Sequence, residues 1–145
     1  LPEGVSADRV VVDKSDRTLL LLKGDSVLKR YRVSFGGNPV GHKQQEGDER
    51  TPEGEYLIDR RKEDSSFYRA LHISYPDGED LARARRQGVS PGGEIMIHGI
   101  RNGFGWIGRL HRRLNWTDGC VAVTNWEMDE LWRAVQVGTP IEIRR

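Results

Sequence analysis

The chain is built from short apolar segments separated by glycine, proline and charged residues. Its longest uninterrupted apolar run, residues 19–22, has four members, whereas a membrane-spanning helix needs roughly 20. Eight segments have the length and the alternating or β-branched pattern of strands. These are residues 10–12, 19–22, 27–35, 56–58, 71–75, 95–98, 120–124 and 141–143. The pattern predicts a mostly β protein and excludes a transmembrane helix.

A long loop and a short helix are predicted in the middle of the chain. Residues 36–54 are rich in glycine, proline and charge, a composition that favours a surface loop. His42 lies in this loop and is expected to be exposed to solvent. Residues 79–87 contain good helix formers and are followed by Gly88, a residue that suits the position after a helix end.

A second helix is predicted over residues 125–135. Thr124 and Glu127 have the spacing of a capping box, and Gly138 is placed to end the helix. Helical spacing aligns four apolar side chains on one buried face: Met128, Leu131, Trp132 and Val135. With the strands, the two helices predict a single domain over residues 1–145, a β-sandwich or closed sheet decorated by helices.

Charge and cysteine content narrow the classes of function. The 23 basic and 22 acidic side chains give a formal net charge of +1, too weak a field to favour nucleic acid or an anionic membrane surface. Cys120 is the single cysteine, so no intramolecular disulfide can form. The chain starts at Leu1 without a charged and apolar leader, so its location has to be inferred from its substrate.

Cys120 and one histidine form the strongest chemical candidate. A thiol with an ordinary pKa of about 8.5 is only slightly ionised at neutral pH, so cysteine catalysis needs a nearby base. His98 ends one predicted strand and Cys120 begins another, with 21 residues between them, and neighbouring strands would bring the two side chains together. Gly119 would let the backbone approach an incoming carbonyl closely. The amide N–H groups of Asp118, Gly119 and Cys120 would face a developing oxyanion.

Other interpretations of the same residues are open at this point. A lone cysteine is most often a small buried apolar residue, and a histidine at a strand end is usually structural. A zinc site made of His98, His111 and Cys120 would leave an open coordination position. Because no short paired-ligand spacing supports such a site, we expect no metal.

Four motifs follow one another in a recognisable order. Thr-Pro-Glu-Gly-Glu-Tyr occupies residues 51–56, His98 is followed by Gly99, Thr-Asp-Gly-Cys occupies residues 117–120, and Gly-Thr-Pro-Ile occupies residues 138–141. Together they resemble the L,D-transpeptidase catalytic domain, the YkuD-type fold. That family carries Thr-Pro-x-Gly-x-aromatic, His-Gly and Ser/Thr-x-Gly-Cys elements in this order. The resemblance covers nearly the whole chain.

The resemblance implies a cysteine acyltransferase that acts on the stem peptides of bacterial peptidoglycan. Cys120 would attack the carbonyl of the third stem residue, usually diaminopimelate, and expel the terminal D-alanine to leave a thioester. The thioester would then be attacked by an amine of a second stem, by a lysine of a wall-linked lipoprotein, or by water. His98 would serve as general base and acid, with the Gly99 carbonyl orienting its ring. The resemblance implies no cofactor and a location in the periplasm or cell envelope.

Two positions depart from the family pattern. Many members have a histidine where this chain has Asp118 and an arginine where it has Ala122. Asp118 would disfavour the thiolate by like charge, and the usual contact to a substrate carboxylate is missing. The Trp-Thr-Asp-Gly-Cys version resembles the YafK-like branch, which is associated with hydrolysis of lipoprotein-to-peptidoglycan links. A hydrolase of the amidase or L,D-endopeptidase type is therefore the rival function, and a non-catalytic wall-binding module is the third.

Residues that contact the substrate are expected mainly in the loop before Cys120. Arginine forks pair with carboxylates, and aromatic rings stack on the apolar faces of sugars. The candidates are Trp106, Arg109, Trp116, Thr117 and, on a strand, His72. A solvated basic loop is the alternative for the loop residues, and a hydrogen-bonded structural role is the alternative for His72.

Overall fold

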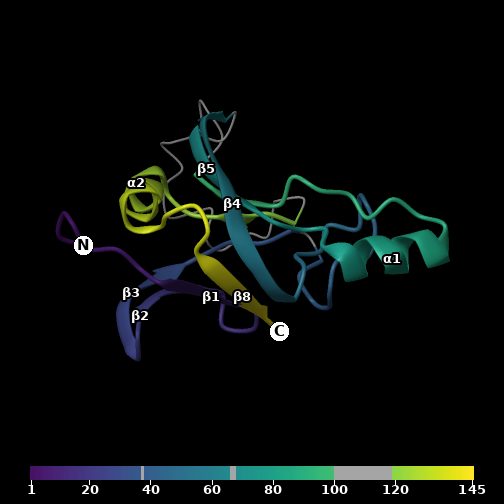
Figure 1. Ribbon diagram of the computed structural model, residues 1–145, viewed down its shortest axis with the longest axis horizontal. Coiled ribbons are helices and arrows are strands. Elements are labelled where there is room, and N and C mark those ends of the chain that lie inside the picture. Colours follow the sequence, from purple (N-terminus) through teal and green to yellow (C-terminus); the bar gives the residue numbers. More distant parts are fainter. Residues whose placement is uncertain (37, 66–67, 100–118) are drawn as a thin grey trace.

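The described part of the chain contains eight strands and two helices. The computed structural model describes residues 1–36, 38–65, 68–99 and 119–145. The strands are β1 (Arg9–Asp13), β2 (Thr18–Lys23), β3 (Ser26–Arg32), β4 (Gly54–Ser65), β5 (Tyr68–Ile73), β6 (Met96–His98), β7 (Val121–Ala122) and β8 (Pro140–Arg144). The helices are α1 (Gly78–Gln87) and α2 (Asn125–Ala134). The prediction of a mostly β fold with two helices is confirmed (Figure 1).

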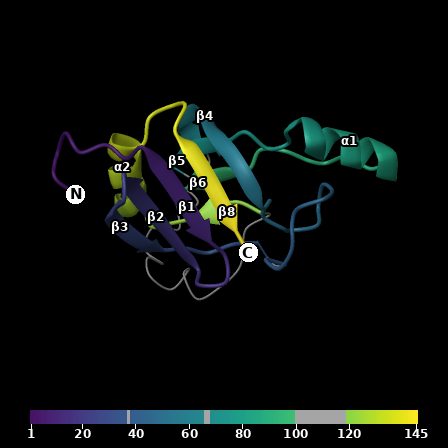
Figure 2. The same cartoon turned by 60° about the horizontal axis from the view of Figure 1, so that its bottom comes forward.

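The strands form one mixed sheet in the order β3-β2-β1-β8-β4-β5-β6-β7. The β1–β8 and β6–β7 pairs are parallel, and the other pairs are antiparallel. β4 pairs with β8 through residues 54–57 and with β5 through residues 58–65. The long strand therefore connects the two halves of the sheet, and Figure 2 shows it beside β8, with β1 and β2 following on the far side of β8.

A backbone bridge joins the two ends of this strand order. Ser34, two residues after β3, exchanges hydrogen bonds with Ala122 of β7, at N–O distances of 3.0 and 2.9 Å. The bridge closes the sheet, because β3 and β7 are its outer strands. Ala122 also pairs with His98 of β6, so the closure lies directly beside the candidate histidine.

The strands that carry the candidate residues have one apolar face and one mixed face. Side chains alternate along a strand, so neighbours in sequence face opposite sides. Leu71, Ile73, Ile97 and Val121 belong to the apolar core. The opposite face, which we call the site face, carries Ala70, His72, Met96, His98 and Ala122. These residues lie outside the core cluster, although each is buried.

α2 covers the core with the predicted face. Met128, Leu131 and Val135 are fully buried, whereas Trp132 is only partly buried at the edge of the cluster. The guanidinium of Arg61 lies 3.9 Å from the centre of the Trp132 ring, a cation–π contact that a partly exposed ring allows.

The helix ends follow the sequence signals with one exception. The capping box of Thr124 and Glu127 is present at the start of α2, and Gly88 takes a left-handed conformation with φ of 68° at the end of α1. Gly138 does not end α2. Val135 is the C-cap residue, and Gly138 lies in the turn before β8. In the described ranges, neither helix has the length and apolar character needed to cross a membrane.

β4 is much longer than the sequence predicts. The apolar signal covers only residues 56–58, but the strand runs from Gly54 to Ser65. Residues 59–64 are all charged, and residues 60–63 are exposed. Their extended form comes from pairing with β5 and not from burial of their own side chains.

Candidate active site

His98 is a buried histidine held by its neighbouring peptide. It is the last residue of β6, is 1% exposed, and pairs with Ala70 on one side and Ala122 on the other. Its Nδ1 lies 2.7 Å from the carbonyl oxygen of Gly99. A carbonyl oxygen only accepts, so Nδ1 carries the hydrogen and the lone pair of the neutral ring is on Nε2. This contact is the one expected of Gly99, and it leaves Nε2 as the basic atom.

Burial controls the charge of His98. Loss of solvation lowers the pKa of His98 from 6.5 to about 4, and the hydrogen bond to Gly99 offsets only part of that effect. The ring is therefore neutral at pH 7. A neutral imidazole can accept a proton, which an imidazolium cannot.

Cys120 lies where β7 begins and is partly exposed. Its Sγ donates a hydrogen bond to the carbonyl oxygen of Glu94, at a distance of 3.4 Å. Val121 pairs with Ile97, and both are core residues. Alternation therefore assigns Cys120 to the site face, together with His98 on the adjacent strand. The thiol is not sealed in the apolar core.

The glycine before Cys120 is required by close packing. Gly119 has a φ of 117°, and a Cβ at this position would lie 2.5 Å from the carbonyl oxygen of Arg50. No side chain fits at that distance. The close approach of an incoming carbonyl to Gly119 stays a prediction, and in the structure the backbone of Arg50 packs against this residue. Thr51 Oγ1 also donates a hydrogen bond to the Gly119 carbonyl oxygen, at 2.8 Å.

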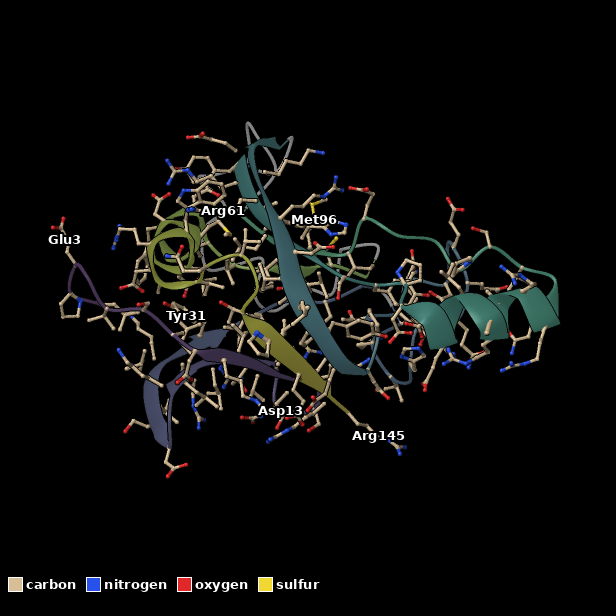
Figure 3. All side chains as sticks on the ribbon, in the orientation of Figure 1. Glu3, Asp13, Tyr31, Arg61, Met96 and Arg145 are labelled. Atoms are coloured by element: carbon tan, nitrogen blue, oxygen red, sulfur yellow. The ribbon has the colours of Figure 1, made fainter. Side chains whose placement is uncertain are left out.

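His72 lies on the same face, one strand further from Cys120. It is 9% exposed, and its Nδ1 is 2.6 Å from Asp59 Oδ1. It pairs with Met96 across β5 and β6. Figure 3 labels Met96, whose strand β6 is separated from β4 by β5. The carboxylate contact is the structural role considered for His72, and its predicted contact with substrate stays a prediction.

Several predicted site residues lie outside the described ranges. They are Trp106, Arg109, Trp116, Thr117 and Asp118, together with His111 of the disfavoured zinc site. Their roles in binding and in the oxyanion site remain predictions. Among the residues that the structure describes, no group of three or more His, Cys, Asp and Glu side chains could hold a metal ion.

Sequence reasoning missed two buried polar contacts near the Thr-Pro motif. The Lys14 side chain is 3% exposed, and its ammonium donates to the Thr51 carbonyl oxygen at 2.7 Å. His42 was expected in solvent, but only 20% of its side chain is exposed, and it contacts Asp80 at 2.8 Å. The Thr-Pro motif was the available signal for the first contact. The sequence contains no local signal for the second, because its partners are 38 residues apart.

The comparison with protein families identifies the class. Residues 7–143 match the YkuD family, the L,D-transpeptidase catalytic domain. The chain therefore belongs to the L,D-transpeptidase (YkuD) family.

Individual relatives agree with this assignment. The chain is 31% identical over 132 residues to "Putative L,D-transpeptidase YafK" of Escherichia coli K12, with 87% of this chain and 46% of that protein covered. It thus spans about half the length of the curated relatives it matches.

Two solved structures share the fold. The helical cell shape determining protein Pgp2 of Campylobacter jejuni has a TM-score of 0.70 at 24% identity, with 98% of this chain and 49% of that chain covered. An L,D-transpeptidase of Xylanimonas cellulosilytica has a TM-score of 0.59 at 18% identity, with 98% and 62% covered. At these identities the likeness establishes the fold.

Proposed function

We propose that this domain is a cysteine acyltransferase that acts on peptidoglycan stem peptides, with Cys120 as the nucleophile and His98 as its general base. The observation that carries the proposal is the pairing of β6 with β7, in which His98 lies opposite Ala122, two residues after Cys120. Membership of the L,D-transpeptidase family supports the substrate class. A substrate in the bacterial wall supports a location in the periplasm or cell envelope.

The resting pair of side chains is uncharged in this proposal. Burial keeps His98 neutral at pH 7, and Cys120 Sγ lies 3.4 Å from the Glu94 carbonyl oxygen, a contact in which sulfur is the donor. General-base catalysis fits this state better than a preformed thiolate and imidazolium pair. The proton therefore has to leave sulfur during the attack.

The first half of the reaction forms a thioester. The proton of the Cys120 thiol passes to Nε2 of His98 while Sγ bonds to the carbonyl carbon of the third stem residue. The carbonyl oxygen becomes an oxyanion, for which the backbone N–H groups of Gly119 and Cys120, and the predicted one of Asp118, are the donors. The imidazolium then protonates the departing amine of D-alanine. The products are free D-alanine and an acyl group on sulfur.

The second half transfers the acyl group and restores the thiol. An acceptor amine attacks the thioester and gives a proton to His98, which returns it to the departing Cys120 sulfur. With an amine from a second stem the product is a cross-link. With water in its place the product is a shortened stem and the enzyme is a hydrolase.

Product analysis tests this function. The protein is incubated with tetrapeptide-bearing disaccharide muropeptides containing diaminopimelate, and the products are separated and weighed by mass spectrometry. Release of D-alanine together with dimers is the expected result, and Cys120→Ser should abolish both. Tripeptides without dimers would reassign the domain as a hydrolase.

A matched control separates loss of chemistry from loss of fold. His42→Gln changes a histidine whose two ring nitrogens are both hydrogen-bonded within the protein, and it should retain the products. Unchanged muropeptides with the wild type would contradict the proposed function and favour wall binding without turnover. Products that persist in Cys120→Ser would contradict the role of Cys120 as the nucleophile.

A further inference from the structure

Thr51 connects the Thr-Pro motif to the backbone that carries Cys120. Its side chain is fully buried, and its hydroxyl donates to the Gly119 carbonyl oxygen at 2.8 Å. The two residues are 68 positions apart in the chain, so local structure does not account for the contact. A buried hydroxyl bonded to the peptide unit of the nucleophile can influence the reaction without touching the substrate.

The Gly119 carbonyl and the Cys120 N–H belong to the same planar peptide unit. The described chain has a cis peptide only at Tyr75-Pro76, so the Gly119–Cys120 peptide is trans. In a trans peptide the C=O and N–H bonds point in opposite directions, so fixing the oxygen also fixes the direction of the N–H. A hydrogen bond to the carbonyl also polarises the unit and strengthens its N–H as a donor.

Thr51 is itself held in place from both sides. The buried ammonium of Lys14 donates to the Thr51 carbonyl oxygen at 2.7 Å and pairs with Glu53 at 3.1 Å. The preceding carbonyl, that of Arg50, packs against Gly119 so closely that a Cβ there would lie 2.5 Å away. The hydroxyl of Thr51 therefore acts from a fixed position and not from a mobile loop.

We propose that Thr51 is a positioning residue for acyl transfer, because its hydroxyl holds the Gly119 carbonyl and thereby aims the Cys120 N–H at the oxyanion. This inference rests on the proposed function and deepens it. It assigns a role to the Thr-Pro motif that the reaction steps leave without one.

Two kinds of electrophile distinguish this role from simple support of the fold. A carbapenem such as imipenem acylates a thiol through a tetrahedral oxyanion, so its rate depends on the oxyanion donors. Iodoacetamide alkylates the same sulfur by displacement of iodide, and no oxyanion forms. Both reactions need the thiol to lose its proton, so the ratio of the two rates isolates the oxyanion donors.

The experiment measures both rate constants by intact-protein mass spectrometry. Thr51→Val keeps the shape and removes the hydroxyl, and Thr51→Ser restores it. Thr139→Val is the matched control, because Thr139 Oγ1 donates to the Gln136 carbonyl oxygen at 2.6 Å in the turn before β8. If Thr51→Val does not fold, Thr51→Ala takes its place.

Loss of one oxyanion donor lowers a rate by about 100- to 1,000-fold, and misalignment of one should lower it by about 10-fold or more. We expect this loss for carbapenem acylation of Thr51→Val, with alkylation unchanged, recovery in Thr51→Ser and no effect in Thr139→Val. An equal fall in both rates, or no fall in acylation, would overturn the inference alone. A wild-type protein that is alkylated but never acylated would contradict the proposed function, and the inference would fail with it.

Discussion

His98 and His42 are held in opposite ways. His98 Nδ1 donates to the Gly99 carbonyl oxygen, which leaves the lone pair of the ring on Nε2. His42 Nδ1 instead accepts the backbone N–H of Glu53 at 2.7 Å, so its Nε2 carries the hydrogen and donates to Asp80 at 2.8 Å. The first arrangement produces a base, whereas the second commits both ring nitrogens to the fold.

The surroundings of the two rings differ as much as their tautomers. Burial alone would raise the pKa of Asp80, but hydrogen bonds from Tyr56, the backbone of Asp77 and His42 outweigh it and hold that pKa below its usual value. His42 thus faces a carboxylate. His98 faces a carbonyl oxygen, and burial lowers its pKa to about 4. The partner of Nδ1 thus defines the tautomer of each ring, and only in His98 does it place the lone pair on Nε2.

The largest effect on turnover is expected from removal of the Cys120 sulfur. Cys120→Ala should reduce turnover of tetrapeptide muropeptides by about 10,000-fold or more, because no other group can form the thioester. The free energy of unfolding should change little, since the side chain is partly exposed. Turnover assays and urea unfolding measure the two quantities, and residual turnover within about 10-fold of the wild type would exclude Cys120 as the nucleophile.

Variants of His98 and His42 should differ in the rate at which a carbapenem acylates Cys120. His98→Gln should slow carbapenem acylation of Cys120 by about 100-fold or more, because the general base is lost. His42→Gln should leave the rate unchanged. Equal acylation rates in the two variants would show that His98 is not the general base for the Cys120 thiol.

The pH dependence of stability should also depend on His98. Its pKa is 6.5 in the unfolded chain and about 4 in the fold, so the unfolded state binds the proton first as the pH falls. Stability is therefore lost between pH 6.5 and 4, on the order of 3 kcal/mol in total. Urea unfolding across this window should show a steeper loss for the wild type than for His98→Gln. Parallel curves would mean that burial does not lower the pKa of His98 below its value in the unfolded chain.

The smallest effect is expected on the free energy of unfolding when His42 is replaced. His42→Gln leaves the Glu53 N–H or the Asp80 carboxylate without its present partner, and it should destabilise the fold by about 1–3 kcal/mol. Thermal unfolding at pH 7 measures the change. An unchanged melting temperature would show that the contact to Asp80 contributes nothing.

Local patterns in the sequence predict most of the elements. The helical spacing of the apolar side chains in α2 and the capping box of Thr124 and Glu127 are properties of one short segment. The sequence alone therefore predicts them. The charged second half of β4 could not, because its extended form depends on pairing with β5. The fold class also followed from these local patterns, whereas the bridge between Ser34 and Ala122 that closes the sheet did not.

In the candidate site, too, local motifs could be predicted from the sequence, whereas contacts between distant residues could not. Cys120, His98 and the glycines beside them were identified from residue type and motif. The contact of Thr51 with Gly119 and the buried ammonium of Lys14 depend on residues that meet only in the folded chain. Their partners are 68 and 37 positions away in sequence, and spacing alone cannot indicate which distant groups will be buried together.

Trapping of the acyl-enzyme shows whether acyl transfer passes through Cys120. The wild-type protein is mixed with an excess of a tetrapeptide muropeptide, quenched in acid and weighed intact. We expect an added mass equal to the muropeptide minus D-alanine, located on Cys120 after digestion and removed by hydroxylamine. Turnover of the muropeptide with no such adduct, or with an adduct on another residue, would contradict acyl transfer through this sulfur.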